Sequence, residues 1–317
     1  MPESTTVYYS TDTGAPAISG TVGSLIGLLY SCLVTGYGAK IAAGWTRPYT
    51  GTNNAVFQAG GGNQRFLQVL DNSESAGGAK EARMTGYESM TGLASGSGPF
   101  PSAAQSVTGL ICRKSTTADA TARPWVLVAT DRTFYLFIQT GDYSTLSHGF
   151  GFGDFISYKT GGDDYGTFII GKQVENDANG SNERLAYAAT AVNSAVITGH
   201  YVARNYTGVG SSCQVAKFID GSKTTLTSNT MGSNQYIAYP NAPDGGLWLC
   251  PVWLSQPVSS NYVLRGHLPG LWCPLHTTPL SHLDTFNGTG EMSGKAFQAI
   301  NVANSGQVII ETSSTWS

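Results

Sequence analysis

Most of the chain alternates short apolar runs with turns rich in glycine, proline, asparagine and aspartate. The clearest case is an apolar run at residues 125–129, a two-residue polar turn, and a second run at residues 133–139. β-Branched and aromatic residues on both sides of a tight polar turn predict a β-hairpin. Runs at residues 150–158 and 167–170 follow, so we predict an antiparallel meander.

Further segments with a strand-like pattern lie near the start of the chain and in its C-terminal half. They are residues 5–9, 214–219, 235–239, 246–254, 261–264, 296–302 and 307–312. No helical segments alternate with these strands, which favours a sandwich or barrel over a parallel α/β sheet. The predicted fold class is therefore mainly β, an antiparallel β-sandwich or barrel with one short N-terminal helix.

The predicted helix covers residues 21–34. Positions on one predicted face recur at spacings of three and four, as in an amphipathic helix, and all but the first are apolar: Ser24, Leu25, Leu28, Leu29, Cys32 and Leu33. Gly36 and Gly38 are expected to end it, because glycine adopts a positive φ without steric cost. A second segment, residues 183–192, fits either a helix or a strand.

Composition changes at residues 73–80, 94–102 and 175–183. The glycine- and serine-rich stretch around residues 94–101 is the predicted boundary between an N-terminal region, residues 1–100, and a main β domain, residues 101–317. The N-terminal region would hold an extended arm and the helix. No repeat of fixed period is present, which argues against a solenoid or propeller.

Composition and charge exclude several classes of protein. The chain has 40 glycines in 317 residues and only 12 % charged residues, about half of the usual share. So much glycine excludes a long helical protein, while the aromatic content excludes disorder. The net charge is −3 and no basic run exceeds the pair Arg113-Lys114, so no nucleic-acid partner is expected.

The longest apolar stretch, residues 25–34, is too short to cross a bilayer, and the first residues lack the basic flank of a signal peptide. We expect a soluble protein made in a cytoplasm, with no membrane partner. The cysteines agree with this: they are odd in number and far apart, which does not suit a disulfide framework. We expect them to be small buried hydrophobes: Cys32, Cys112, Cys213, Cys250 and Cys273.

The densest group of metal-capable residues lies near the C-terminus: His267, Cys273, His276, His282 and Asp284. Zinc needs three or four nitrogen or sulfur ligands, and the spacing of Cys273 and His276 suits a loop. The alternative is a proline-ordered loop whose histidines make ordinary hydrogen bonds. Because no Cys-x-x-Cys knuckle is present, we predict no metal and no cofactor, and keep these residues as candidates.

Signals for catalysis are poor. No Gly-x-Ser-x-Gly elbow occurs, and residues 166–173 resemble a phosphate-binding loop but have the β-branched and aromatic residues of a strand. Asp163-Asp164 could serve glycoside hydrolysis, but the surrounding turn composition favours a solvated hairpin tip. The pair Arg113-Lys114 beside Cys112 is expected to solvate the end of a strand. We therefore predict no catalytic residues and no enzyme.

Three aromatic residues lie in segments rich in glycine, asparagine and threonine: Tyr49, Phe100 and Tyr206. For these residues, contact with another subunit and packing in the core both stay open.

Several strings, in this order along nearly the whole chain, resemble a group of structural proteins of tailed bacteriophages. They are Thr11-Asp12-Thr13-Gly14-Ala15-Pro16, Gly44-Trp45-Thr46, Gly86-Tyr87-Glu88-Ser89, Gly98-Pro99-Phe100-Pro101, residues 118–136, residues 151–158 and residues 265–276. The resemblance implies a virion component that is assembled in the host bacterial cytoplasm. It carries over no catalytic residues.

The first hypothesis is thus a non-enzymatic virion protein that acts by assembly, with a capsid decoration, cement or minor capsid protein favoured. Its partners would be copies of itself, as a homo-oligomer, and other capsid or tail proteins. Loops at residues 60–62, 73–80 and 94–102 would contact neighbouring subunits and become ordered in the particle.

Three alternatives remain. The chain could be a tail, neck or baseplate subunit, or a host-recognition module that binds carbohydrate through loop aromatics. A virion-borne hydrolase is the last of the three.

Overall fold

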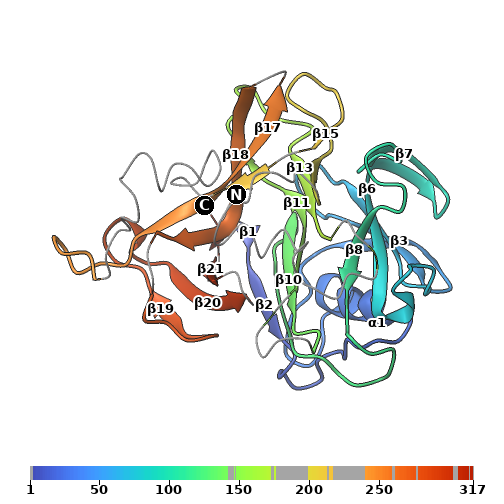
Figure 1. Ribbon diagram of the computed structural model, residues 1–317, viewed down its shortest axis with the longest axis horizontal. Coiled ribbons are helices and arrows are strands. Elements are labelled where there is room, and N and C mark those ends of the chain that lie inside the picture. The colour runs from blue at the N-terminus through green and yellow to red at the C-terminus, as the bar shows by residue number, and fades with distance from the viewer. Residues whose placement is uncertain are drawn as a thin grey trace.

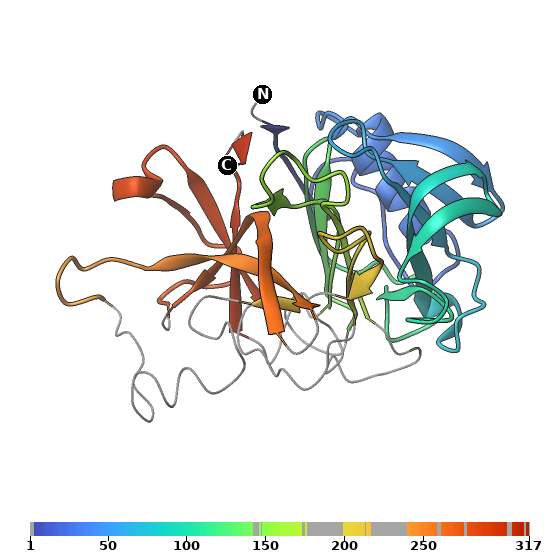
Figure 2. The same ribbon diagram turned by 90° about the horizontal axis from the view of Figure 1, so that it is seen from above.

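The computed structural model has three large antiparallel sheets stacked as layers, as Figure 1 and Figure 2 show. It describes residues 3–141, 146, 148–172, 175, 199–212, 214–216, 240–258, 261–275, 278–302, 306–313 and 315–316. Within these residues the chain is mainly β with one short α-helix, so the predicted fold class is confirmed.

The first sheet contains β3 (Thr46–Gly51), β4 (Asn54–Gln58), β5 (Phe66–Leu70), β6 (Glu81–Gly92), β7 (Ser95–Phe100) and β8 (Leu110–Arg113). The strands follow the order β3-β4-β5-β6-β7, and β8 pairs with β6. A single 3-10 turn, Gly78–Lys80, precedes β6.

The middle sheet contains β2 (Thr6–Tyr9), β9 (Trp125–Ala129), β10 (Thr133–Ile138), β11 (His148–Asp154), β13 (Thr167–Ile170), β14 (His200–Val202) and β15 (Ser211–Ser212). Their order is β15-β14-β13-β11-β10-β9-β2. The predicted meander of β9, β10, β11 and β13 is confirmed, since each strand pairs antiparallel with the next.

The third sheet contains β12 (Ile156–Ser157), β16 (Gln214–Ala216), β17 (Leu249–Val258), β18 (Asn261–Pro274), β19 (Thr285–Asn287), β20 (Ala296–Val302) and β21 (Gly306–Glu311). Their order is β16-β17-β18-β21-β20-β19, with β12 beside β18. A 3-10 turn, Gly290–Met292, follows β19. Separately, β1 (Glu3–Ser4) pairs with β22 (Thr315–Trp316), so the two ends of the chain lie together (Figure 1).

The middle sheet is buried on both faces. Trp125 and Leu127 of β9 belong to the core shared with the first sheet, while Val126 and Val128 belong to the core shared with the third. Strands β9, β10 and β13 are buried at every position. Two-sided burial explains why these strands are continuous apolar runs, whereas a half-exposed strand would alternate apolar and polar residues.

The predicted helix is present as α1 (Ser24–Leu29), continued by π-helical turns over Tyr30–Thr35. Its apolar face is buried in the core beneath the first sheet, through Leu25, Leu28 and Leu29. The helical segment ends at Gly36, whose φ of 76° is the positive value that was predicted. None of the described helices has the length and apolar character that a membrane crossing requires.

Several later strands match their predicted ranges closely, among them β20, whereas β18 is much longer than predicted. The possible helix at residues 183–192 and the possible strand at residues 235–239 lie outside the described residues.

Three segments that were expected to contact other subunits are held within the chain. The stretch around residues 94–101 forms β7, which pairs with β6. The backbone N–H groups of Gly60 and Gly61 donate to the Asp131 carbonyl over 2.9 and 3.1 Å. The Ser75 hydroxyl bonds Glu81 over 2.6 Å. These intrachain bonds are formed without a neighbouring subunit, and the predicted ordering of the loops in a particle stays a prediction. The domain boundary near residue 100 stays a prediction.

The pair Arg113-Lys114 is buried, which corrects its predicted role as a solvated strand end. The Lys114 ammonium lies 2.5 Å from Asp71 Oδ1 and also donates to the Thr21 carbonyl over 2.6 Å. Asp71 Oδ2 accepts the backbone N–H of Leu25 in the first turn of α1 over 2.9 Å. The two side chains thus tie the first sheet to the start of the helix.

Replacing Lys114 with methionine tests this tie. Lys114→Met leaves the Asp71 carboxylate buried without its counter-charge, so we expect a loss of about 3 to 5 kcal/mol in the free energy of unfolding. Adding Asp71→Asn, which keeps an acceptor for Leu25, should recover part of the loss. Urea unfolding measures both, with Lys80→Met as the control. A loss below about 1 kcal/mol for Lys114→Met would contradict the assignment.

Candidate functional site

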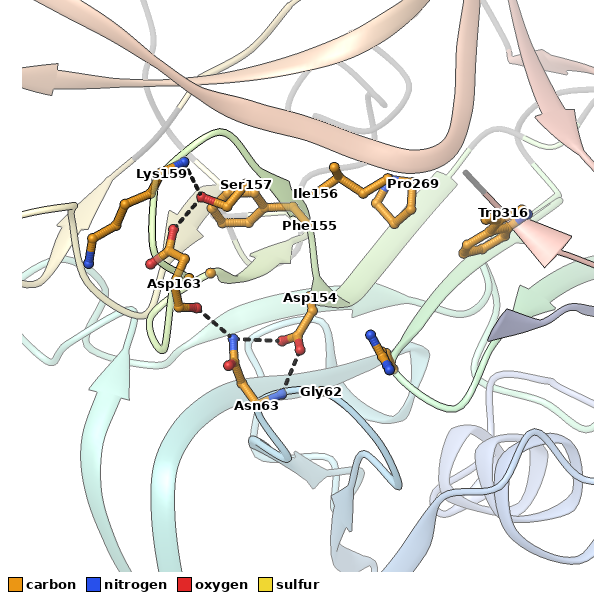
Figure 3. A pocket seen from close by; sticks show the side chains of 13 residues that line it. Gly62, Asn63, Asp154, Phe155, Ile156, Ser157, Lys159, Asp163, Pro269 and Trp316 are labelled. Atoms are coloured by element: carbon orange, nitrogen blue, oxygen red, sulfur yellow. Dashed lines mark hydrogen bonds between the residues drawn. The ribbon is translucent and has the colours of Figure 1, made fainter. Parts of the chain in front are cut away.

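A cavity of about 320 Å³ lies where the three layers meet (Figure 3). Its walls come from the loop after β4, the segment from β11 to β13, strand β18 and the C-terminal strand β22. The lining residues are Gly62, Asn63, Arg132, Asp154, Phe155, Ile156, Ser157, Lys159, Gly162, Asp163, Gly166, Pro269 and Trp316.

Asp154, at the end of β11, stands on the polar wall of the cavity. Its Oδ1 accepts from the Thr167 hydroxyl over 2.5 Å and from Asn63 Nδ2 over 3.3 Å, and its Oδ2 accepts from the Asn63 backbone N–H over 2.7 Å. Burial raises the pKa of Asp154 above its ordinary value, against the hydrogen bonds that favour the charged form. This carboxyl therefore fixes the first sheet layer to the middle one.

Asp163 is a second carboxylate of the same wall. Arg265 holds it with two charge-assisted bonds, Nε to Oδ2 over 2.7 Å and Nη2 to Oδ1 over 2.6 Å, and the Ser157 hydroxyl donates to Oδ2 over 2.6 Å. Burial alone would raise the pKa of Asp163, but these bonds and the Arg265 charge outweigh it and lower the pKa. Its side chain is only 3 % exposed. The prediction of a solvated hairpin tip was wrong for Asp163, because its partner lies 102 residues away in the sequence.

Asn63 links the two carboxylate segments. Besides its bonds to Asp154, its Nδ2 donates to the Asp163 carbonyl over 3.2 Å. The preceding residue must be glycine: at Gly62 the φ is 61°, and a Cβ would lie 2.0 Å from Asp154 Oδ2. Close approach of this loop to β11 thus depends on the glycine.

The opposite wall is apolar and includes Ile156, Pro269 and Trp316 (Figure 3). Trp316 is held in place because its indole N–H donates to the Glu311 carbonyl over 2.8 Å and its ring lies 5.7 Å from that of Tyr135. At Gly270, whose φ is 67°, a Cβ would lie 2.3 Å from the indole ring. Trp316, and with it the apolar wall, is therefore held both by its hydrogen bond and by its packing against Tyr135 and Gly270.

Exposed residues border the mouth of the cavity: Gly62, Lys159 and Gly162. The Lys159 backbone N–H donates to the Ser157 hydroxyl over 3.2 Å, so the backbone of this rim is anchored.

The two carboxylates have pKa values displaced in opposite directions, a pattern also found in acid–base pairs of enzymes. Here, however, both oxygens of Asp163 and both of Asp154 accept hydrogen bonds from the chain itself. The arrangement is suited to holding a small polar molecule between a polar and an apolar wall.

The residues proposed as metal candidates are engaged otherwise. His267 Nδ1 lies 2.9 Å from the Tyr158 hydroxyl, which accepts the Trp253 indole N–H over 3.2 Å. The Tyr158 hydroxyl donates to Nδ1 of a neutral His267 ring in one tautomer and accepts from an Nδ1–H in the other. Burial, and to a lesser degree the charge of Lys295, lowers the pKa of His267 and favours this neutral ring.

Of the other candidates, Cys273 is buried, and His282 Nδ1 accepts the backbone N–H of Asn301 over 3.1 Å. Asp284 accepts the backbone N–H of Ser281 over 2.6 Å. His276 lies outside the described residues. Across the ranges that the structure describes, no three His, Cys, Asp or Glu side chains are grouped to hold a metal.

Among the cysteines, the four that fall in the described residues are buried thiols, as predicted: Cys32, Cys112, Cys250 and Cys273. Cys213 lies outside the described residues.

The three aromatic interface candidates lie on separate elements. Phe100, at the end of β7, is 1 % exposed and stacks on Phe152 at 6.0 Å, so for this residue the structure shows core packing. Tyr49 is half-buried in β3, where its hydroxyl donates to the Met90 carbonyl over 3.2 Å. Tyr206 is 42 % exposed.

The residues of the cavity were not predicted together as a site. Of these residues, Asp163 was weighed as half of a carboxylate pair and then assigned to a hairpin tip. A second local signal was the glycine run at residues 60–62, since consecutive glycines indicate a backbone that approaches another part of the chain closely. The pairing of its neighbour Asn63 with Asp154 is a tertiary contact that no local pattern contains.

Replacing Asp154 with asparagine should change how stability depends on pH. A raised pKa means that the folded protein binds this proton more tightly than the unfolded chain, so the contribution of the carboxyl to stability falls as pH rises above the ordinary value of 3.8. Asparagine does not titrate. The unfolding free energy of Asp154→Asn relative to the native protein should therefore increase between about pH 4 and pH 6.

Urea unfolding across that pH range measures the difference. The control is Asp119→Asn, where hydrogen bonds from Thr121 lower the pKa of the exposed carboxyl. A lowered pKa changes stability mainly below the ordinary value of 3.8, so the relative stability of this variant should stay nearly constant between about pH 4 and pH 6. A constant or decreasing difference for Asp154→Asn would contradict the raised pKa.

Comparison with known proteins assigns the chain to no family. No protein-family model matches the sequence, and a search of curated proteins gives no significant match.

Proposed function

We propose that the protein is a non-enzymatic structural component of a tailed-bacteriophage particle and acts by assembly. A place on the capsid, as a decoration, cement or minor capsid protein, is favoured. The partners would be copies of the chain itself and other virion proteins. The proposal combines the resemblance of the sequence strings with the distribution of charge described below.

The supporting observation is that, in the part of the chain that the structure describes, seven of the few charged residues are buried inside the fold. Of 17 basic and 20 acidic residues, these are buried: Asp71, Glu81, Arg113, Lys114, Lys172, Arg265 and Glu311. Several form ion pairs with one another, such as Lys114 with Asp71 at 2.5 Å and Arg113 with Glu81 at 3.6 Å. The outer surface is therefore poorer in charge than the composition suggests.

A surface poor in charge suits contact with other proteins. The desolvation of charged groups opposes association, and charged residues are depleted in the core of protein interfaces. The described surface also exposes large apolar side chains, including Ile41, Val107, Val209 and Leu264. These features support assembly in a capsid, and equally in a tail, neck or baseplate, which is the alternative place in the particle.

Purified particles from cells that express the gene provide the direct test. Mass spectrometry should find the chain in multiple copies per particle, and particles made without it should bind the isolated protein. Electron microscopy of the complex then separates the capsid from the tail. Absence from the particles, together with a free monomer that binds no virion protein, would overturn the proposal.

Charge substitutions on the exposed apolar residues test the surface. Ile41→Glu, Val107→Glu, Val209→Glu and Leu264→Glu should each change the unfolding free energy by less than about 0.5 kcal/mol, because the side chains are exposed. At least one should reduce incorporation into particles about tenfold or more, since a buried unpaired charge opposes association.

Incorporation is measured by quantitative mass spectrometry of particles assembled with each variant. The matched control is Leu264→Gln and its equivalents at the other positions, which add polarity without charge. Wild-type incorporation of all four glutamate variants would contradict a role for this surface in assembly.

A further inference from the structure

The geometry points to a binding site for a single saccharide unit in the cavity at the junction of the layers. This inference goes beyond the proposed assembly role and does not depend on it. It rests on the size of the cavity, on its two unlike walls, and on the rigidity of the residues that form them.

The size of the cavity limits the ligand. At about 320 Å³ it lies at the lower end of the range for small-molecule sites. One sugar ring suits such a volume, whereas a peptide or an acyl chain needs a longer groove. The exposed rim at Gly62, Lys159 and Gly162 leaves an entrance for a unit that belongs to a longer glycan.

The two walls match the two kinds of surface on a sugar. Figure 3 places Asn63, Asp154 and Asp163 on one side and Ile156, Pro269 and Trp316 on the other. A pyranose ring presents hydroxyl groups around its edge and apolar C–H groups on its faces. Hydroxyls would meet the polar wall, and the C–H groups would contact the apolar one.

The polar wall keeps capacity for a ligand. Among the described residues Asp154 Oδ2 accepts one bond, from the Asn63 backbone N–H, so one of its two lone pairs remains for a hydroxyl donor. The Lys159 side chain extends away from the cavity (Figure 3), so its ammonium is not part of this wall. A sugar hydroxyl is a donor, which fits the open acceptor position on the carboxylate.

The walls are fixed before a ligand enters. Arg265 and Ser157 hold Asp163, Thr167 and Asn63 hold Asp154, and the Glu311 carbonyl holds Trp316. Binding therefore requires little ordering of side chains, which reduces the entropic cost.

Charge argues against a phosphate ligand. The cations Arg132 and Lys159 line the cavity together with the carboxylates Asp154 and Asp163, and Arg265 neutralises Asp163. The charged side chains that remain at the cavity do not form the cluster of cations that a phosphate group requires. The polar wall likewise opposes a purely apolar ligand.

Titration of the full chain with purified oligosaccharides tests the site. The probes are neutral glucose- and galactose-based oligosaccharides and uronic-acid oligosaccharides. Each is titrated up to about 10 mM, so that a dissociation constant of roughly 1 mM can be measured. Trp316 lines the cavity, so intrinsic fluorescence reports binding, and calorimetry gives the stoichiometry. We expect one class of glycan to bind with one site per chain.

One variant locates the binding in the cavity. Asp154→Asn should weaken binding about tenfold, since an amide oxygen is a poorer acceptor than a carboxylate. Two controls should bind as the native protein does. Lys159→Ala removes a side chain that extends away from the cavity, and Lys80→Ala removes a lysine that does not line it.

Absence of binding by every probe, or equal binding by the native protein and Asp154→Asn, would overturn the site. Either result leaves the assembly proposal intact, because incorporation into particles is measured separately. Binding confined to the uronic-acid probes would assign an acidic sugar, and binding confined to the others a neutral one, and both support the inference.

Discussion

Two-sided burial of the middle sheet is the constraint on which the rest of the structure depends. Because β9, β10 and β13 are buried at every position, their side chains contribute to two cores, one on each face of the middle sheet. Removing either outer sheet would expose one of these cores to water. The outer sheets in turn need only one apolar face each. This explains how a chain with many polar and glycine residues still encloses two large cores.

Polar side chains fix the layers to one another at the edges of these cores. Lys114 and Asp71 join the first sheet to α1, and Arg204 joins Glu88 of the first sheet over 2.5 Å. Arg265 of the third sheet holds Asp163 of the loop before β13. Directional bonds of this kind set the position of each layer, whereas apolar contacts alone leave sheets free to slide. Charged residues that form these bonds inside the fold are not on the outer surface. The bonds that position the layers therefore also lower the charge of the surface.

Sequence patterns predicted the elements that the two cores define. The hairpin of β9 and β10 and the strand β13 were predicted closely, because burial on both faces makes them unbroken runs of β-branched and aromatic residues. The first sheet was largely missed. Strands such as β3 and β7 are rich in glycine, serine, threonine and proline and mostly exposed, so they resemble turns until tertiary pairing is known. The cavity could not be predicted for a related reason: Asn63, Asp154 and Asp163 meet only after the layers have stacked.

The position of the cavity follows from the same stacking. Three twisted sheets cannot remain in contact along all their edges, and the space between them here is bounded by the segments that connect the layers. Such segments must satisfy their backbone groups and carry glycines where they pass closely, as Gly62 does against Asp154. Polar side chains are therefore concentrated at the junction, while Trp316 and Pro269 continue the apolar core into its other wall. A fold whose layers are fixed by directional bonds thus produces a rigid, two-sided recess at their junction without further elements.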